Sequence, residues 1–580
     1  MRILGISALF HDSAAALVDG GRVVAAVQEE RLSRKKNDAR LPLEAARECL
    51  AQGGLELADV DWVVFYEKPI AKFDRILQTS LGAWPRGILR FTRAMRTWLG
   101  DRLWLEGRLA RELGTSADRI LFSDHHLSHA ASAFFPSPLE RAAVLTVDGV
   151  GEWTTSAIHH ATTGDDGRAR LATVARQRFP GSMGLLYSAI TAYLGFEVNV
   201  GEYMVMGLAA YGEPRFLPEL SRVARLGPAG ELALDMRYFA FHRSDAQSFS
   251  PRLEALLGPA RDPATPIDLD TAEGRRLADV AASVQRLCED YLVAAAREAR
   301  RVTGEADLCL AGGVALNCVA NARVAREAGF DRVVVHPAAG DAGGALGAAL
   351  LVANALGEPR DRATLSPQLG RAWADEEVRG FLRDVRVRHT AFDDDDALVT
   401  EVARRLARGE VGGWFQGGSE WGPRALGGRS ILADARDPGM ADRVNARVKY
   451  REPFRPFAPA ALADDAHRFF ALDGGRYEGL TPHMLAVVPL TDAGRAELPA
   501  VCHADGTARV QTVDSRHHPR FRALLEAFRA ETGVGVLLNT SLNLKGEPIC
   551  GSPVDALATF DRSDLDFLVV ERCLVDKRAA

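Results

Sequence analysis

Residues 123–135 read SDHHLSHAASAFF. Ser123 or Asp124, ahead of a run with helical spacing, is typical of a helix N-cap. In the helix that this predicts, His125 and His129 lie four residues apart on one face. The plain alternative is a pair of hydrogen-bonded core histidines, but two neutral imidazoles at this spacing also supply half of a metal coordination sphere. The stretch therefore predicts a capped, buried helix that contributes to a metal site and needs carboxylates from elsewhere.

Two aspartates at the ends of expected strands are candidates for those carboxylates. Residues 3–27 are expected to form short strands around a polar turn, and residues 142–160 repeat the pattern with Asp148 in the turn. Such a duplication is typical of a split α/β domain that grips a nucleotide phosphate between its halves. Asp341 follows a further strand and precedes a glycine-rich helix. A mixed nitrogen and oxygen site of the sort used by iron, manganese or zinc is therefore predicted from His125, His129, Asp148 and Asp341.

A glycine pair joins a strand to a helix within LCLAGGVALN, residues 308–317. Gly312 and Gly313 let the backbone approach a flat or anionic ligand, and the following helix N-terminus favours negative charge. A glycine turn of this kind can also be mere geometry. We predict that Gly312, Gly313 and Asn317 bind a nucleotide or substrate.

The last third of the chain carries a second constellation, in which cations stand among glycines, prolines and aromatic residues. These cations are Arg424, Arg429, Lys449, Arg451 and Arg455. Such cations are suited to clamping phosphate oxygens, where the arginine fork gives bidentate bonds; ordinary surface salt bridges are the alternative. Neutral polar groups follow the apolar run VGVLL, namely Asn539, Ser541 and Asn543. The sequence therefore predicts a phosphate-binding site after residue 400.

Composition places the chain among ordinary globular proteins. Its 580 residues correspond to about three or four domain-sized units, and 47% hydrophobic and 26% charged residues are usual values. A net charge of −6 argues against recruitment of nucleic acid or an anionic membrane. Seven cysteines without a CxxC pair favour reduced thiols in a cytoplasm. The N-terminus has no signal-peptide pattern, and the long uncharged runs are expected to be buried helices rather than membrane spans.

Residues 72–114 alternate arginines with tryptophans and other aromatic residues. A nucleic-acid surface is one interpretation, but the helical period and the acidic balance of the chain favour amphipathic helices with arginine stems over an apolar face. We expect these helices to form a lid or partner surface.

The ordered motifs of the chain resemble those of the NodU/CmcH carbamoyltransferase family. The motifs that carry the resemblance span nearly the whole chain and are, in order, ILGISALFHDSAAALV, QEERLSRKKND, HHLSHAASAF, TVDGVGEW, GEYMVMGLAAYG, LAGGVALN, GDAGGALGAA, GPRALGGRSI, KYREPFRPFAP and NTSLNLKGEPI. The resemblance implies an α/β fold with an N-terminal ASKHA domain, which is a duplicated ribonuclease H-like domain, over residues 1–357. It also implies a linker over residues 358–370 and a C-terminal YrdC-like α/β domain over residues 371–580. Met204 departs from the family pattern, which often has lysine there.

The same resemblance implies an ATP-dependent O-carbamoyltransferase. The C-terminal domain would convert carbamoyl phosphate and ATP, with Mg²⁺, into carbamoyl adenylate, and the N-terminal domain would pass the carbamoyl group to a hydroxyl of a small molecule. Antibiotics, macrolides and aminoglycosides are acceptors of this kind. The KxR pattern falls on Lys449 and Arg451, and the SxN pattern on Ser541 and Asn543. The metal site, holding Fe²⁺ or another divalent ion, would fall on the histidine helix and its two aspartates.

Roles for the charged groups follow from this chemistry. Lys449, Arg451 and Arg455 would neutralise phosphate charge in the transition state. His11, in the exposed turn, is the expected general base, with Asp12 as a second candidate. The remaining predicted substrate- or nucleotide-binding residues are Arg424, Arg429, Asn539, Ser541, Asn543, Gly312, Gly313 and Asn317. The expected partners are carbamoyl phosphate, ATP and the acceptor, with no nucleic acid and no membrane, and the expected assembly is a homodimer.

Three alternatives stay open at this point. One is an ASKHA-type small-molecule kinase, although a kinase has no need of the second constellation after residue 400. Another is carbamoylation of a nodulation-type oligosaccharide. The third is a nucleotide-regulated binding module without activity, in which the histidine site would be structural.

Overall fold

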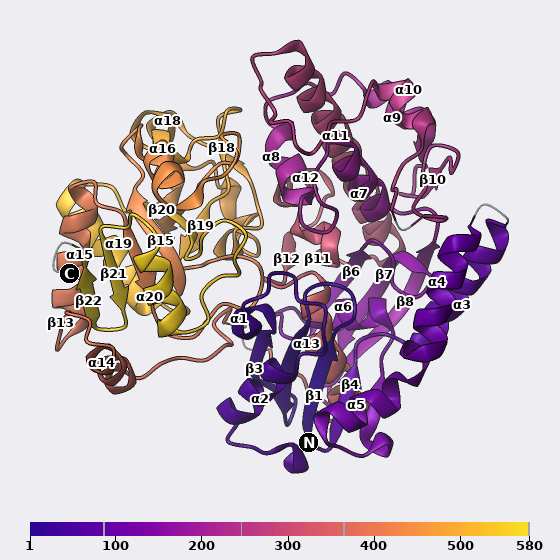
Figure 1. The fold of residues 1–580 in the computed structure, drawn as a ribbon, viewed down its shortest axis with the longest axis horizontal. Coiled ribbons are helices and arrows are strands. Elements are labelled where there is room, and N and C mark those ends of the chain that lie inside the picture. The colour runs from indigo at the N-terminus through magenta and orange to yellow at the C-terminus, as the bar shows by residue number, and fades with distance from the viewer. Residues whose placement is uncertain (85–86, 245, 363–365, 578–580) are drawn as a thin grey trace. The chain divides into compact units, whose positions relative to one another are not determined.

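The computed structural model describes residues 1–84, 87–244, 246–362 and 366–577, and the chain divides into two compact units (Figure 1). The first unit holds residues 1–26 and 39–364, and the second holds residues 27–38 and 365–580. The expected boundaries at 357 and 371 stay predictions, and residues 363–365 of the expected linker lie outside the described residues. One feature that the sequence does not indicate is the membership of residues 27–38 in the second unit.

The first unit contains two five-stranded sheets. The strand order of one is β3-β2-β1-β4-β5, in which β1 pairs antiparallel with β2 and parallel with β4. Its strands are β1 (Arg2–Ser7), β2 (Ala14–Asp19), β3 (Arg22–Gln28), β4 (Trp62–Phe65) and β5 (Ile120–Phe122). The order of the other is β12-β11-β6-β7-β8, in which β6 pairs antiparallel with β7 and parallel with β11. Its strands are β6 (Arg141–Val147), β7 (Thr154–Thr163), β8 (Ala169–Arg178), β11 (Asp307–Ala311) and β12 (Arg332–Val335).

The two sheets have the same topology. In each, three consecutive antiparallel strands are followed by two strands that extend the sheet in parallel from the first. Parallel additions need crossover connections, and helices supply them. This is the duplicated ribonuclease H-like arrangement of the ASKHA fold, which confirms the predicted fold class for the first unit.

Two helices made largely of small residues carry the first unit's central packing. Helix α6 (His125–Phe134) lies against α13 (Asp341–Ala355), and α13 in turn lies on β1 and β2. A Cβ atom added at Gly347 of α13 would lie 1.7 Å from the Ser128 carbonyl oxygen of α6. On the opposite side of α13, a Cβ added at Gly5 of β1 would lie 1.9 Å from the Ala345 carbonyl oxygen. Only glycine fits at these two contacts, so they set how closely α6 approaches the sheet.

A long helix packs against four other helices of this unit. Helix α11 spans Ala272–Thr303, with the Thr271 side chain capping its start and Gly304 in the left-handed region at its end. Its apolar face, which includes Val280, Val284, Leu287 and Tyr291, is buried. It packs against α7 (Met183–Tyr193), α8 (Glu202–Ala209), α9 (Leu217–Val223) and α12 (Cys318–Glu327). None of the described helices is long and apolar enough to cross a membrane.

The arginine- and tryptophan-rich stretch is helical, as expected. Its helices are α3 (Pro69–Gly82), α4 (Ile88–Gly100) and α5 (Leu105–Leu113). Residues 85 and 86, which include an arginine of the predicted surface, lie outside the described residues. The other helices of this unit are α2 (Leu43–Gln52) and α10 (Pro251–Leu257), and a hairpin joins β9 (Ala224–Leu226) to β10 (Leu232–Leu234).

The second unit is also α/β, built on a mixed eight-stranded sheet. Its strand order is β13-β22-β21-β14-β15-β20-β16-β19. These strands are β13 (Thr390–Ala391), β14 (Gly412–Phe415), β15 (Arg429–Asp434), β16 (Ala458–Leu462), β19 (Gln511–Val513), β20 (Val536–Ser541), β21 (Phe567–Val570) and β22 (Cys573–Asp576). Helices α15 (Asp395–Ala407) and α19 (Pro519–Thr532) pack together on this sheet through a buried apolar core. Helix α16 (Met440–Val444) continues into a π-helical turn at Asn445–Lys449.

Shorter elements complete the second unit. They are α1 (Glu30–Ser33), α14 (Asp375–Asp384), α17 (Ala466–Phe469), α18 (Asp492–Glu497), α20 (Pro553–Asp561), β17 (Val488–Pro489) and β18 (Thr507–Ala508).

Candidate functional site

The first unit gathers the four predicted metal ligands at one place. Asp124 caps α6 by accepting a hydrogen bond from the Leu127 amide at 3.1 Å, which fixes where the helix begins. His125 Nε2 then lies 2.9 Å from Asp148 Oδ2, just beyond the end of β6. His129 Nε2 lies 3.4 Å from Asp341 Oδ1, at the start of α13.

The donor set and its burial fit a divalent metal ion. One ligand atom from each of His125, His129, Asp148 and Asp341 lies within 4.8 Å of the others. Both histidines and Asp341 are buried, so the four polar groups have little water to compete with an ion. Two imidazoles and two carboxylates are a ligand set that iron, manganese and zinc accept.

The pKa values of the side chains in and beside this cluster are strongly shifted. Burial alone would raise the pKa of Asp148, but hydrogen bonds from both histidines outweigh it and hold that pKa well below its usual value. Burial opposes protonation of His129, yet its hydrogen bonds to the two aspartates raise its pKa to about 9. His126, on another face of α6, bonds Thr146 Oγ1 at 2.7 Å and the Thr154 carbonyl at 2.9 Å. Burial and the neighbouring histidines lower the pKa of His126, so it is a neutral core histidine.

Three residues that contact the cluster, Tyr66, Glu67 and Glu152, were not predicted from the sequence. The Tyr66 hydroxyl donates to Asp341 Oδ2 at 3.4 Å. Glu67 Oε2 lies 3.8 Å from His125 Nδ1, and Lys72 Nζ holds the Glu67 carboxylate at 2.6 Å. Glu152 Oε1 accepts the His125 amide at 3.2 Å. The signal for Tyr66 and Glu67 is their place directly after the strand WVVF.

The predicted general base lies in a strained turn near this cluster. His11 Nδ1 is 3.1 Å from Asp12 Oδ2, and Asp12 adopts a left-handed φ of 57°. Burial opposes protonation of His11, but the charges of Asp12, Asp341 and Asp148 together raise its pKa to about 9. His11 therefore interacts electrostatically with Asp341 and Asp148, two of the predicted metal ligands. Left-handed non-glycine residues of this kind are often found at functional sites.

The glycine turn also reaches the cluster. The Gly313 amide donates to Asp148 Oδ1 at 3.1 Å, and Gly312 has a φ of 92° that glycine alone tolerates easily. Asn317 serves as the N-cap of α12, accepting the Ala320 amide at 3.0 Å, while its Nδ2 donates to Gln285 Oε1 at 2.9 Å. The Gly313 amide therefore positions the Asp148 carboxylate. The Asn317 side chain caps the helix that it begins, α12.

In the second unit, the predicted lysine meets the predicted serine and asparagine. Lys449 Nζ donates to Asn543 Oδ1 at 2.8 Å, to the Asn543 carbonyl at 3.1 Å and to Ser541 Oγ at 3.3 Å, and it also contacts the Ser541 carbonyl. Burial and the charges of Arg451 and Arg455 lower the Lys449 pKa well below its usual value. The side chains therefore form a compact site with an unusual concentration of positive charge.

The other predicted cations of the second unit lie in different surroundings. The Arg451 guanidinium stacks 4.2 Å from the Phe457 ring centroid, and Arg455 lies 3.4 Å from Glu452. Arg424 is half-buried. Arg429 has no exposed surface; it donates to the carbonyls of residues 371, 416 and 428 and lies 3.6 Å over the Phe415 ring centroid. Asn539 is likewise buried and donates to Gln511 Oε1 at 2.8 Å. In this structure the Arg429 and Asn539 side chains are therefore buried and hydrogen-bonded within the second unit.

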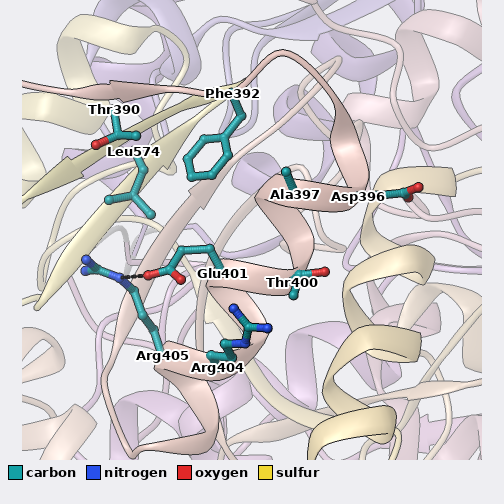
Figure 2. Close-up of a pocket in the computed structure, with 9 residues that line it drawn as sticks. All are labelled: Thr390, Phe392, Asp396, Ala397, Thr400, Glu401, Arg404, Arg405 and Leu574. Carbon is teal, nitrogen blue, oxygen red and sulfur yellow. Dashed lines mark hydrogen bonds and ion pairs between the residues drawn. The ribbon is translucent and has the colours of Figure 1, made fainter.

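A separate hollow of about 510 Å³ lies between α15 and the strands β13 and β22 (Figure 2). Three of its charged residues are in ion pairs: Arg405 bonds Glu401 at 3.1 Å (Figure 2). Arg405 also bonds Asp576 at 2.8 Å, and Arg404 bonds Glu531 at 3.3 Å. None of the predicted site residues lines it.

Comparison with known families gives a match over most of the chain. A family profile described as Carbamoyltransferase N-terminus matches residues 2–350, and one described as Carbamoyltransferase C-terminus matches residues 403–577.

Individual relatives agree with these profiles. An uncharacterized protein of Synechocystis sp. is 43% identical, over 100% of this chain and 97% of that protein. Nodulation protein NolNO of Sinorhizobium fredii is 40% identical, over 98% of this chain and 79% of that protein. The 3'-hydroxymethylcephem-O-carbamoyltransferase of Streptomyces clavuligerus is 34% identical, over 49% of this chain and 51% of that enzyme.

Proposed function

Because this chain belongs to the carbamoyltransferase family, we propose that it is an ATP-dependent O-carbamoyltransferase with one chemical step in each unit. In the first step carbamoyl phosphate, water and ATP give carbamoyl adenylate, pyrophosphate and phosphate. In the second step the acceptor oxygen bonds the carbamoyl carbon, the carbon–oxygen bond to AMP breaks, and the acceptor proton passes to a base. Carbamate esters form from neutral alcohols only when the leaving group is good, and AMP meets that need.

The second unit is the proposed place of adenylate formation, as the YrdC-like resemblance implies. The observation that carries this is the contact of Lys449 with Ser541 and Asn543, which lie 92 and 94 positions further along the chain. Arg451 and Arg455 add positive charge there, which suits a site for polyphosphate and its developing negative charge. ATP would enter with Mg²⁺ on its phosphates.

The first unit is the proposed place of transfer. His125, His129, Asp148 and Asp341 would hold a divalent ion, and we propose Fe²⁺. Such an ion, when bound, supplies Lewis-acid polarisation of the carbamoyl oxygen. The chain's own groups do the rest: Gly313 orients Asp148, Tyr66 orients Asp341, and His11 takes the acceptor proton at the unprotonated ring nitrogen. Because the aspartates raise the pKa of His11, it acts as a base only where their charge is offset.

A small-molecule hydroxyl is the proposed acceptor. The names of two relatives, a nodulation protein and a cephem O-carbamoyltransferase, support a natural-product or oligosaccharide alcohol. The amphipathic helices α3, α4 and α5 are the proposed determinants of acceptor choice. Large hydrophobic side chains are exposed on α3 (Ile70 and Leu81) and α4 (Leu99), and Trp84 and Trp104 are exposed in the turns beside these helices. A cytoplasmic location and a homodimer belong to the same proposal.

The test is incubation of the purified protein with ATP, Mg²⁺ and ¹⁴C-carbamoyl phosphate but no acceptor. Pyrophosphate and phosphate released together, with a labelled species that co-elutes with AMP, are the expected products. ADP as the nucleotide product would instead place the protein with the ASKHA kinases.

A further inference from the structure

The second unit includes a short segment, residues 27–38, that is more than 300 positions away in sequence from the rest of that unit. Residues 27–38, with the sequence VQEERLSRKKND, form β3's end, helix α1 and the turn after it. Arg31 of α1 is buried, and its Nη2 donates to the Gly422 carbonyl at 2.6 Å. A Cβ added at Gly551 would lie 2.3 Å from the Arg31 carbonyl oxygen. The backbone of α1 therefore lies directly on the loop around Gly551.

Arg34 forms hydrogen bonds and an ion pair with the same loop. It ends α1 in a left-handed conformation, with a φ of 58°. Its Nη1 donates to the Ile549 carbonyl at 2.8 Å, its Nη2 donates to the Pro548 carbonyl at 3.1 Å, and its Nε lies 3.2 Å from Asp555 Oδ1. Three directed contacts from one guanidinium leave little freedom between α1 and residues 548–555.

The loop that Arg34 holds is the one that completes the Lys449 site. Asn543 Nδ2 donates to the Glu547 carbonyl at 2.6 Å, and the Cys550 amide donates to the Leu542 carbonyl at 3.1 Å. Asn543 Oδ1 in turn accepts Lys449 Nζ. A continuous set of bonds thus runs from Arg34 through the loop to Lys449.

Lys36 brings a further charge to this place. Its side chain is exposed, and among the described residues no carboxylate pairs with it. Lys36 lies two residues after Arg34, whose guanidinium bonds the Pro548 and Ile549 carbonyls of the loop that completes the Lys449 site. In keeping with this place, the charges of Arg451, Arg455 and Lys36 lower the Lys449 pKa. Glu452 is the carboxylate that pairs with Arg455 there. Cations that repel one another in this way are stabilised by a bound polyanion.

We propose that two residues of this segment serve the adenylate-forming site: Lys36 binds phosphate oxygens of a substrate, and Arg34 positions the loop that carries Asn543. The inference rests on the proposed function. The phosphate belongs either to ATP or to carbamoyl phosphate, and the two substrates are titrated separately to tell which.

The experiment measures pyrophosphate release by the full-length protein without acceptor, varying one substrate while the other is saturating. Lys36→Ala is expected to raise KM about tenfold for one of the two substrates, with kcat changed less than about twofold, because one screened charge contact is removed. Lys36→Arg should restore that KM. Lys35→Ala, at the neighbouring residue, which is also exposed, should leave both KM values unchanged.

Arg34 has a different expected signature, because a positioning residue acts on the geometry of the site. Arg34→Ala should lower kcat about tenfold, while Arg34→Lys, which cannot reproduce the forked contacts, should recover only part of it. The inference is overturned if Lys36→Ala and Lys35→Ala behave alike while the unmodified protein releases pyrophosphate. Release of ADP by the unmodified protein would instead overturn the proposed function itself.

Discussion

The Nε2 atoms of His125 and His129 lie 3.2 Å apart on successive turns of α6. Two nitrogens bound to one ion at about 2.1 Å, with an angle between 90° and 109°, are separated by about 3.0–3.4 Å. The two imidazoles are therefore already at the spacing of neighbouring ligands, and the helix itself sets that spacing.

Loss of one ligand should nearly abolish metal binding. His129→Ala or Asp341→Ala removes one of four donors, and the affinity for Fe²⁺ or Mn²⁺ should fall by more than about 100-fold, beyond the loss usual for residues that only support ligands. Metal content by elemental analysis and Kd by calorimetry measure it. His160→Gln, in the same unit but outside the cluster, should keep the full metal content.

Glu67 is predicted to support the cluster without binding the ion. Its carboxylate lies 3.8 Å from His125 Nδ1, on the side away from the aspartates. Carboxylates in this position orient the ring and raise its basicity, so Glu67→Gln should weaken metal binding about 10- to 100-fold. A Kd equal to that of the unmodified protein would show that Glu67 serves Lys72 alone.

Metal affinity should rise with pH. The pKa of His129 in the metal-free protein is raised to about 9, above its ordinary value of 6.5, so the ring carries a proton at neutral pH. An ion must displace that proton, and Kd should fall about tenfold per pH unit between pH 7 and pH 9 for each proton released. Calorimetry in two buffers with different ionisation enthalpies counts the protons. A Kd that stays constant over this range would contradict the assignment.

The contact between α6 and α13 should be intolerant of a single methyl group. Gly347→Ala places a carbon 1.7 Å from the Ser128 carbonyl oxygen, which forces the ligand-bearing helices apart and should cost about 3 kcal/mol of unfolding free energy. Gly107→Ala is the matched control, because Gly107 is an exposed helical glycine of the same unit with no atom near its added Cβ. That control should be stabilised by about 0.5–1 kcal/mol. Urea unfolding of the metal-free protein measures both variants.

Local patterns in the sequence were enough to predict some of these features. The cap and spacing of SDHHLSHAASAFF predict α6, and the repeated strand-turn-strand pattern predicts the duplicated sheets, because both depend on neighbouring residues. The four predicted metal ligands and the Lys449, Ser541 and Asn543 group follow from motif order, and the structure brings each group together.

Other features depend on contacts that no local pattern reports. Arg31 meets Gly422, 391 positions away, so the membership of residues 27–38 in the second unit is invisible to periodicity. Arg429 was predicted to bind a nucleotide or substrate, yet strand β15 begins there and places its guanidinium 3.6 Å over the Phe415 ring centroid, where it donates to backbone carbonyls. Glu67 was missed because its role is defined by His125, on another element.

The central claim, that the two chemical steps belong to two separate sites, is tested most directly by rapid quenching of two variants with ATP and ¹⁴C-carbamoyl phosphate. His129→Ala should form labelled carbamoyl adenylate and pyrophosphate at the rate of the unmodified protein, and Lys449→Ala should form neither. Loss of adenylate formation in His129→Ala, or its persistence in Lys449→Ala, would contradict the account.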